Sequence, residues 1–303
     1  MNPLVSILIP NYNKAPFLRE TLDSVLKQSY IYWECIIVDD HSTDGSWKIL
    51  EEYAEKDSRF HLFKRPEDRM AGGNAARNYA FEMSKGEFIN WLDSDDILIE
   101  DKIEKQLEIL IDSDYDFVLT SLQNFDDALI KSEFVFEVDK KKRPIKYLKG
   151  SFWFQTSLPL FKRTFLLSLE KLFDEGLRRN QEGELFTRIL LTKPEIFFIN
   201  EIKVIRRIDD QSISSNYLNL TLQEKIKIDY PAKISLFNSF KKNFFLGSEE
   251  RDFFVTWFIF FIQYSDFNRK ELFEAFIVSI FYGNQRQRLL AIKSYFYRIF
   301  HGK

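Results

Sequence analysis

The sequence predicts an α/β fold in which helices flank a central, mostly parallel sheet. Through the first 120 residues, short apolar runs rich in β-branched residues alternate with stretches of helical periodicity. The apolar runs show no regular polar alternation, which is typical of strands buried on both faces of a parallel sheet. Strand–helix alternation of this kind favours a sheet with helices on both sides.

The predicted strands and helices follow one another along the chain. The strands occupy residues 4–10, 33–40, 60–63, 86–96 and 116–122. The helices between them, whose apolar side chains recur every three or four positions, occupy residues 16–28, 42–54, 73–83 and 102–111. The pattern weakens over residues 121–150. Helical periodicity returns in the later part of residues 158–191 and again after residue 216.

The composition argues against several classes of protein. The net charge of −3 gives no general attraction to nucleic acid. The three histidines are far apart, which disfavours a histidine-based zinc site, and Cys35 has no partner for a disulfide. The N-terminus lacks the basic segment of a signal peptide, and the most apolar stretch, residues 253–262, is about half as long as a bilayer span. We therefore expect a cytoplasmic protein, or one bound peripherally to the inner face of the plasma membrane.

Polar clusters follow three of the predicted strands, at the edge of a parallel sheet where ligands bind. They read PNYN at residues 10–13, DD at residues 39–40 and DSDD at residues 93–96. The like charges of DSDD need a counter-charge and no basic residue adjoins them, so a divalent cation is the simplest explanation. Asp95 is then the ligand, and Asp96 caps the helix that follows. The alternative is an ordinary solvated Asp/Ser turn.

Several blocks, in the same order, closely resemble the family 2 glycosyltransferases of the GT-A fold. The resemblance rests on VSILIPNYNKAPFLRETLDSVLKQSYIYWECIIVDDHSTDGS, GGNAARNYA and GEFINWLDSDD, resumes at LPLFKRTFL, FDEGL and QEGELFTRILL, and ends near RRIDDQSIS. It implies an inverting enzyme that needs Mn²⁺ or Mg²⁺ and takes a sugar from a nucleotide-diphosphate donor, in the first place a UDP-sugar. The acceptor that it implies is a hydroxyl of a polysaccharide, a lipid-linked oligosaccharide or another glycan.

The resemblance and the helical, aromatic pattern after about residue 216 together indicate a domain organisation. Residues 1–215 form the GT-A domain, with the nucleotide-sugar-binding half in residues 1–120 and the acceptor-side half in residues 121–215. Residues 216–303 form a helical, aromatic and basic C-terminal region. Within it, residues 284–303 carry basic side chains among apolar ones at helical spacing, which favours peripheral contact with an anionic membrane. Packing of this segment against the GT-A domain is the alternative.

Matching positions imply the residues that bind the nucleotide. Pro10 and Tyr12 flank the base, on which Tyr12 stacks. Asp39 and Asp40 form the acidic pair after the second strand, and Asp40 accepts a hydrogen bond from uracil or ribose. Core packing of Tyr12 and helix capping by Asp40 are the structural alternatives.

The resemblance assigns further residues to the diphosphate and the metal. Gly72 lets the backbone approach the nucleotide. Arg77 neutralises the acid cluster or a phosphate, with a helix-surface salt bridge as the alternative. Asp93 and Asp95 match the Asp-x-Asp metal motif, and Asp93 also reaches the ribose or a metal-bound water.

The acceptor side departs from the family pattern at two positions. Glu182 falls on the position of the catalytic base, although Gln181 replaces the usual first acid of the pair and Glu184 matches the later acid. A helix N-terminus also favours carboxylates for structural reasons. Asp209 stands where the family often has histidine, which makes it a further candidate for the metal.

These departures leave two other interpretations open. One is a GT-A-fold binding or scaffold protein whose catalytic site has decayed. The other is a nucleotidyltransferase on the same kind of sheet, which residues 4–16 disfavour because they contain no glycine for a phosphate-binding loop.

Overall fold

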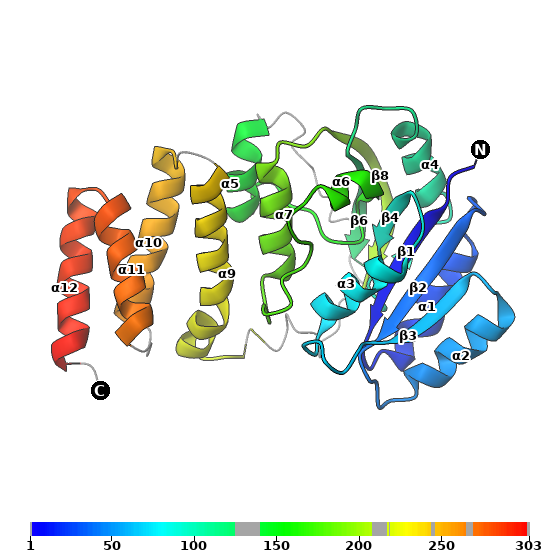
Figure 1. Ribbon diagram of the computed structural model, residues 1–303, viewed down its shortest axis with the longest axis horizontal. Helices are drawn as coiled ribbons and strands as arrows, with labels where there is room; N and C mark the ends of the chain where they lie inside the picture. Colours follow the sequence, from blue (N-terminus) through cyan, green and yellow to red (C-terminus); the bar gives the residue numbers. More distant parts are fainter. Residues whose placement is uncertain are drawn as a thin grey trace. The chain divides into compact units, whose positions relative to one another are not determined.

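The structure is a computed structural model that describes residues 2–124, 140–207, 217, 219–243, 246–264 and 269–301. The chain divides into two compact units, Met1–Asp209 and Asp210–Lys303. The strands in Figure 1 all belong to the first unit, whereas the described part of the second unit is helical. The sequence predicted a boundary after residue 215.

The described part of the first unit contains an eight-stranded sheet in the order β3-β2-β1-β4-β7-β6-β8-β5. The strands are β1 Val5–Asn11, β2 Trp33–Asp39, β3 Phe60–Lys64, β4 Phe88–Trp91, β5 Ile97–Leu98, β6 Phe117–Asn124, β7 Leu160–Lys162 and β8 Ile196–Arg206. The helices are α1 Ala15–Leu26, α2 Ser46–Lys56, α3 Gly73–Met83, α4 Lys102–Leu110, η1 Lys140–Lys142, α5 Arg143–Leu148, α6 Arg163–Leu167 and α7 Gln181–Leu191. The predicted α/β class is confirmed.

The first four strands form a parallel half-sheet, as the sequence predicted. β3, β2, β1 and β4 are neighbours and run in the same direction. Every residue of β1 and β2 is buried, as expected for strands covered on both faces. The carboxyl ends of these strands therefore meet at one edge of the sheet.

The other half of the sheet departs from simple alternation. The strand predicted over residues 116–122 is β6, but it does not lie beside β4. The three-residue strand β7 lies between them and runs antiparallel to both. A strand this short carries no periodic pattern, so the sequence did not reveal it. The remaining pairings are mixed, because β8 runs parallel to β6 and antiparallel to β5.

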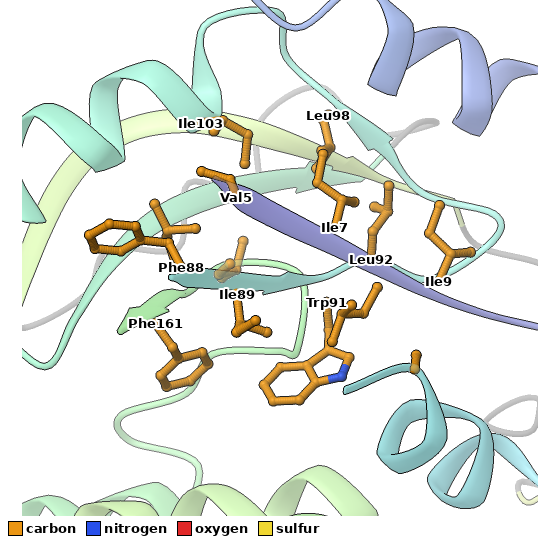
Figure 2. Close-up of a cluster of buried hydrophobic side chains, with 14 of the residues drawn as sticks. Val5, Ile7, Ile9, Phe88, Ile89, Trp91, Leu92, Leu98, Ile103 and Phe161 are labelled. Atoms are coloured by element: carbon orange, nitrogen blue, oxygen red, sulfur yellow. The ribbon is translucent and has the colours of Figure 1, made fainter. Parts of the chain in front are cut away.

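Aromatic packing holds β4 in place. The Trp91 ring packs edge-on against Phe161 and Phe173, with centroid distances of 5.8 and 5.4 Å, and stacks on Phe81 of α3 at 6.3 Å. Figure 2 shows Phe161 and Trp91 on one side of β1 and β4, and Ile103 of α4 on the other. Apolar layers on both faces thus fix the strand that leads into the acid cluster.

The described part of the second unit contains α9 Leu222–Asn243, α10 Ser248–Tyr264, α11 Arg269–Tyr282 and α12 Gln285–His301. Phe237 of α9 packs edge-on against Phe254 and Phe258 of α10, both at 5.5 Å, and against Tyr282 of α11 at 5.3 Å. One aromatic side chain thus ties three helices together. Within the described ranges, no helix has both the length and the apolar character needed to cross a membrane.

Candidate functional site

A pocket of about 600 Å³ opens at the carboxyl ends of β1, β2 and β3. Tyr12 lines it directly after β1, Asp40 directly after β2, and Arg65 directly after β3. The segment before α3 and the loop before α7 complete the wall. The lining residues are Tyr12, Asp40, His41, Arg65, Glu67, Ala71, Gly72 and Arg178.

Asp40 is the best-anchored acid of this pocket. Its Oδ1 accepts a hydrogen bond from Arg65 Nε, and its Oδ2 accepts one of 2.6 Å from the Gly72 backbone N–H. The side chains of Asp40 and Arg65 are each only 8% exposed. Arg65 also donates to the backbone oxygens of Pro66 and Arg69. This buried ion pair therefore ties β2, β3 and the segment before α3 into one wall.

Gly72 has a backbone conformation that favours glycine, with φ at +129°. In this conformation its N–H points at Asp40, while its carbonyl oxygen accepts from the Ala76 N–H in the first turn of α3. Beside it, Arg178 Nη1 donates to the Ala71 carbonyl oxygen at 2.7 Å. Gly72 thus lines the pocket with backbone alone.

The other predicted nucleotide residues have different surroundings. Asp39 is buried, and its oxygens accept from Asn11 Nδ2 at 2.7 Å and from the Ser42 hydroxyl and N–H at 2.6 and 2.8 Å. It anchors the turn after β2 and does not line the pocket. Pro10 is buried within β1, whereas Tyr12 is 56% exposed and does line the pocket.

Folding brings basic side chains to the acid cluster. Arg77 Nη2 of α3 donates to Asp93 Oδ1 at 2.6 Å, and Lys14, which follows β1, places Nζ 2.7 Å from Asp95 Oδ2. Arg77 Nε is buried and has no hydrogen-bond partner among the described residues. Arg77 thus contacts the acid cluster, the first of the two partners expected for it, and Lys14 is a second basic partner that the sequence did not reveal.

Asp96 does not cap a helix, contrary to the prediction. Its Oδ1 accepts from the Arg207 backbone N–H and its Oδ2 from Gln155 Nε2, both at 3.1 Å. Helix α4 begins later, with Asp101 at the N-cap position. Burial and the charges of the two other acids raise the pKa of Asp96 well above its usual value. Asp96, the residue before β5, is instead joined to the residue after β8.

Glu182 lies in the first turn of α7 and belongs to the same site. Its Oε1 accepts hydrogen bonds from the Thr156 backbone N–H at 2.6 Å and from the Thr156 hydroxyl. Burial and the charge of Asp93 raise the pKa of Glu182, while the Thr156 bonds and the charge of Arg77 oppose this. The charges of Asp93 and Arg77 both act on Glu182, so the three side chains lie in one neighbourhood although they come from three separate elements.

The carboxylates of Asp93 and Asp95 are the oxygen donors available to a divalent ion. Burial and the charge of Asp93 raise the pKa of Asp95, opposed by Lys14, so the two carboxylates are close neighbours. One or two carboxylates completed by substrate phosphates suit Mg²⁺ or Mn²⁺. Within the described residues, no three His, Cys, Asp or Glu side chains form a metal cluster by themselves. The residues fit an ion shared with a diphosphate. Asp209, the further candidate ligand, lies outside the described residues.

Three basic residues of the site escaped the sequence analysis: Lys14, Arg65 and Arg178. Arg65 directly follows the third strand, so the rule that places ligands beyond parallel strands would have identified it. The position of Arg178 depends on a contact between its loop and α3. The Asn78 side chain donates to the Phe173 carbonyl oxygen at 2.9 Å and accepts from the Phe173 N–H at 3.0 Å. That contact fixes the loop before α7 and leaves no trace in local sequence.

Of the three aromatic residues at 152–154, only Trp153 is available for stacking. Phe152 and Phe154 are buried in the core, whereas Trp153 is 37% exposed. The Arg206 guanidinium lies 6.0 Å from the centre of the Trp153 ring. Because Gln155 and Thr156 contact Asp96 and Glu182, Trp153 lies on a segment that borders the site.

Comparison with known families decides the kind of protein. The model of glycosyl transferase family 2 matches residues 6–175. The chain belongs to this family. This family 2 glycosyltransferase is 44% identical over 118 residues to TuaG of Bacillus subtilis, a glycosyltransferase assigned to teichuronic acid biosynthesis. It is 37% identical over 133 residues to WfgD of Escherichia coli, a UDP-Glc:α-D-GlcNAc-diphosphoundecaprenol β-1,3-glucosyltransferase. These matches cover 39% and 44% of this chain and about half of each relative, 46% and 51%.

Solved structures share the fold of this family 2 glycosyltransferase. S. aureus TarS 1–349 in complex with UDP-GlcNAc aligns with a TM-score of 0.66 and 17% identity, over 96% of this chain and 89% of that one. The mannosyltransferase PcManGT from Pyrobaculum calidifontis, in complex with GDP-Man and Mn²⁺, aligns with a TM-score of 0.60 and 18% identity, over 100% and 89%. At these identities the likeness establishes the GT-A fold alone.

Proposed function

We propose that this glycosyltransferase moves a sugar from a UDP-sugar to a hydroxyl of a lipid-linked or polysaccharide glycan, with inversion at the anomeric carbon. The proposal rests on the neighbourhood of Asp93, Arg77 and Glu182. Asp93 belongs to the motif expected to bind the metal and the sugar donor, and Glu182 is the candidate base. WfgD is named for a UDP-Glc donor and a diphosphoundecaprenol-linked acceptor, and TarS was solved with UDP-GlcNAc. Both support a UDP-sugar donor, and the name of WfgD also supports a lipid-linked acceptor.

The nucleoside would occupy the pocket at the ends of β1, β2 and β3. Tyr12 stacks on the base with its exposed ring. Asp40 accepts a hydrogen bond from uracil or a ribose hydroxyl, held in place by Arg65 and the Gly72 N–H. Arg178 at the pocket wall offers positive charge to the diphosphate.

The chemistry then takes place between the acid cluster and α7. A divalent ion held by Asp95, with Asp93 in support, would neutralise the charge on the leaving diphosphate; PcManGT was solved with Mn²⁺. Arg77 and Lys14 lie against the same carboxylates and provide further charge for phosphate oxygens. Glu182 takes the proton of the acceptor hydroxyl. At the same time the hydroxyl oxygen bonds to the anomeric carbon, and the bond between that carbon and the diphosphate breaks.

Release of UDP from UDP-sugars in the presence of Mn²⁺, with and without acceptor, tests the proposal. We expect Asp95→Asn and Glu182→Gln each to lower turnover by about 10²–10⁴-fold. Glu52→Gln is the matched control, because Glu52 lies on α2 and is 44% exposed, and its activity should equal that of the wild type. If a UDP-sugar raises the melting temperature but wild type and both variants are equally inert, the chain is a binding protein and the proposed reaction is wrong.

A further inference from the structure

Helix α12 turns its large apolar side chains outward. The side chains that it buries most deeply are small, since Ala291 and Ser294 are buried and Gln263 of α10 donates to the Ser294 hydroxyl at 3.2 Å. One aromatic residue, Tyr295, also faces inward and stacks on Phe276 of α11 at 4.3 Å. On the opposite side, Leu289 is 62% exposed and Phe296 48% exposed. A surface helix of a globular protein ordinarily shows the reverse arrangement. The outward side of α12 thus has the character of a contact surface.

This surface, called the outer face below, extends along most of the helix. Its apolar members are Leu289, Leu290, Ile292, Phe296, Tyr297 and Ile299, all at least 37% exposed. Just before α12, Phe281 of α11 is 70% exposed. Contiguous exposed apolar side chains of this kind mark interaction surfaces.

Basic side chains lie among the apolar ones. Arg286, Arg288 and Lys293 are exposed, and Arg286, Leu289, Lys293 and Phe296 follow one another at intervals of three and four residues, on one side of the helix. From residue 275 to residue 303 the chain contains no Asp or Glu. The outer face is therefore apolar and positively charged, with no acid in this stretch of sequence to offset the charge.

The charge discriminates between possible occupants. A second copy of the chain in a two-fold contact would set the basic side chains of one outer face against those of the other. A lipid surface with anionic headgroups complements them instead, attracting each Lys or Arg near the surface. Aromatic and aliphatic side chains beside these cations suit the boundary between headgroups and acyl chains.

We propose that the outer face of α12 binds the surface of an anionic membrane. The apolar side chains enter the headgroup boundary, and Arg286, Arg288 and Lys293 contact the lipid phosphates. The inference goes beyond the proposed transfer reaction and does not depend on it, because a membrane-bound chain could retain or lack that activity.

Flotation of the full chain with lipid vesicles tests the proposal. We expect binding to vesicles of equimolar phosphatidylcholine and phosphatidylglycerol, and little binding to phosphatidylcholine alone. Arg286→Glu/Lys293→Glu should weaken the binding by at least about 25-fold, roughly fivefold for each cation lost. Leu289→Gln/Phe296→Gln should weaken it without changing the net charge. Lys48→Glu/Lys85→Glu, on exposed positions of the first unit, changes the net charge equally and should bind like the wild type.

Each outcome decides the point. Thermal unfolding and UDP release should be unchanged in the α12 variants, since the replaced side chains are exposed. Equal flotation with both vesicle types, or wild-type binding by the charge-reversed α12 variant, overturns the proposal. A concentration-dependent dimer in sedimentation that the Leu289→Gln/Phe296→Gln variant abolishes, without vesicle binding by the wild type, would assign the outer face to a second copy. If the wild type floats with anionic vesicles but releases no UDP from UDP-sugars, only the proposed transfer reaction is contradicted.

Discussion

Replacing Asp40 by Asn tests whether the buried pair with Arg65 holds the wall of the nucleotide pocket. The two side chains are each 8% exposed, and Asp40 also accepts from the Gly72 N–H. The amide has one acceptor oxygen for two donors, so one donor loses its partner and the guanidinium stays buried beside a neutral group. Removing one partner of a buried ion pair costs about 3–5 kcal/mol, and the bond that the amide keeps returns about 1 kcal/mol.

We therefore expect Asp40→Asn to lower the free energy of unfolding by about 2–4 kcal/mol. For a unit of roughly 200 residues this corresponds to a fall in melting temperature on the order of 5–15 °C. Urea unfolding and calorimetry of the full chain measure both quantities. Glu52→Gln breaks the pair with Arg19, whose partners are 53% and 44% exposed, and should cost less than about 1 kcal/mol.

The refuting result is specific. If Asp40→Asn costs no more than Glu52→Gln, the buried pair does not stabilise the pocket wall. Coupling provides a second check, because Arg65→Met should cost less in the Asp40→Asn background than in the wild type. Additive costs would show that the two side chains act independently, against the contact described above.

Three further predictions concern protonation and metal affinity. Burial and the charge of Asp93 raise the pKa of Glu182 above its ordinary 4.5. Because a base acts only when it is deprotonated, turnover of the wild type should still rise with pH above 4.5. A pH–rate profile that is already flat at pH 4.5 would contradict the assignment of Glu182 as the base. Burial lowers the pKa of Lys102 from 10.5 to about 7, so the unfolded chain binds more protons between these values and this lysine destabilises the fold most below pH 7. Lys102→Met should therefore be more stable than the wild type in urea at pH 7, with the difference shrinking towards pH 10, and a difference that does not depend on pH would refute this. Lys14→Gln removes the ammonium from Asp95, so Mn²⁺ measured by calorimetry without donor should bind up to about fivefold more tightly, and unchanged affinity would mean that Lys14 does not compete for that carboxylate.

Much of the first unit could be predicted because its strands leave a local signature. Strands buried on both faces are mostly apolar, and the runs ending in PNYN, VDD and WLDSDD follow that rule. Parallel strands in turn place Tyr12, Asp40 and Asp93 near one edge of the sheet. The roles assigned to the nucleotide-binding residues, the metal ligands and Glu182 remain predictions that the variants above will test.

Neither β7 nor the surroundings of Asp96 could be predicted from local sequence. A three-residue strand has no period to detect, and it separates β4 from β6. The residues next to Asp96 in the sequence favour a helix cap. Its partners are the Arg207 N–H, 111 positions away, and Gln155, 59 positions away.

The sequence by itself determined the fold class and the edge of the sheet where acids gather, because burial and periodicity are local properties of the chain. The family resemblance assigned Arg77 to these acids, but only the tertiary structure decided which acid each neighbouring side chain contacts. Arg77 of α3 donates to Asp93, and Lys14, which follows β1, pairs with Asp95. Glu182 of α7 is affected by the charge of Asp93. These charged side chains come close to one another only after segments distant in sequence pack together. A Coulomb interaction between such segments leaves no pattern among neighbouring residues.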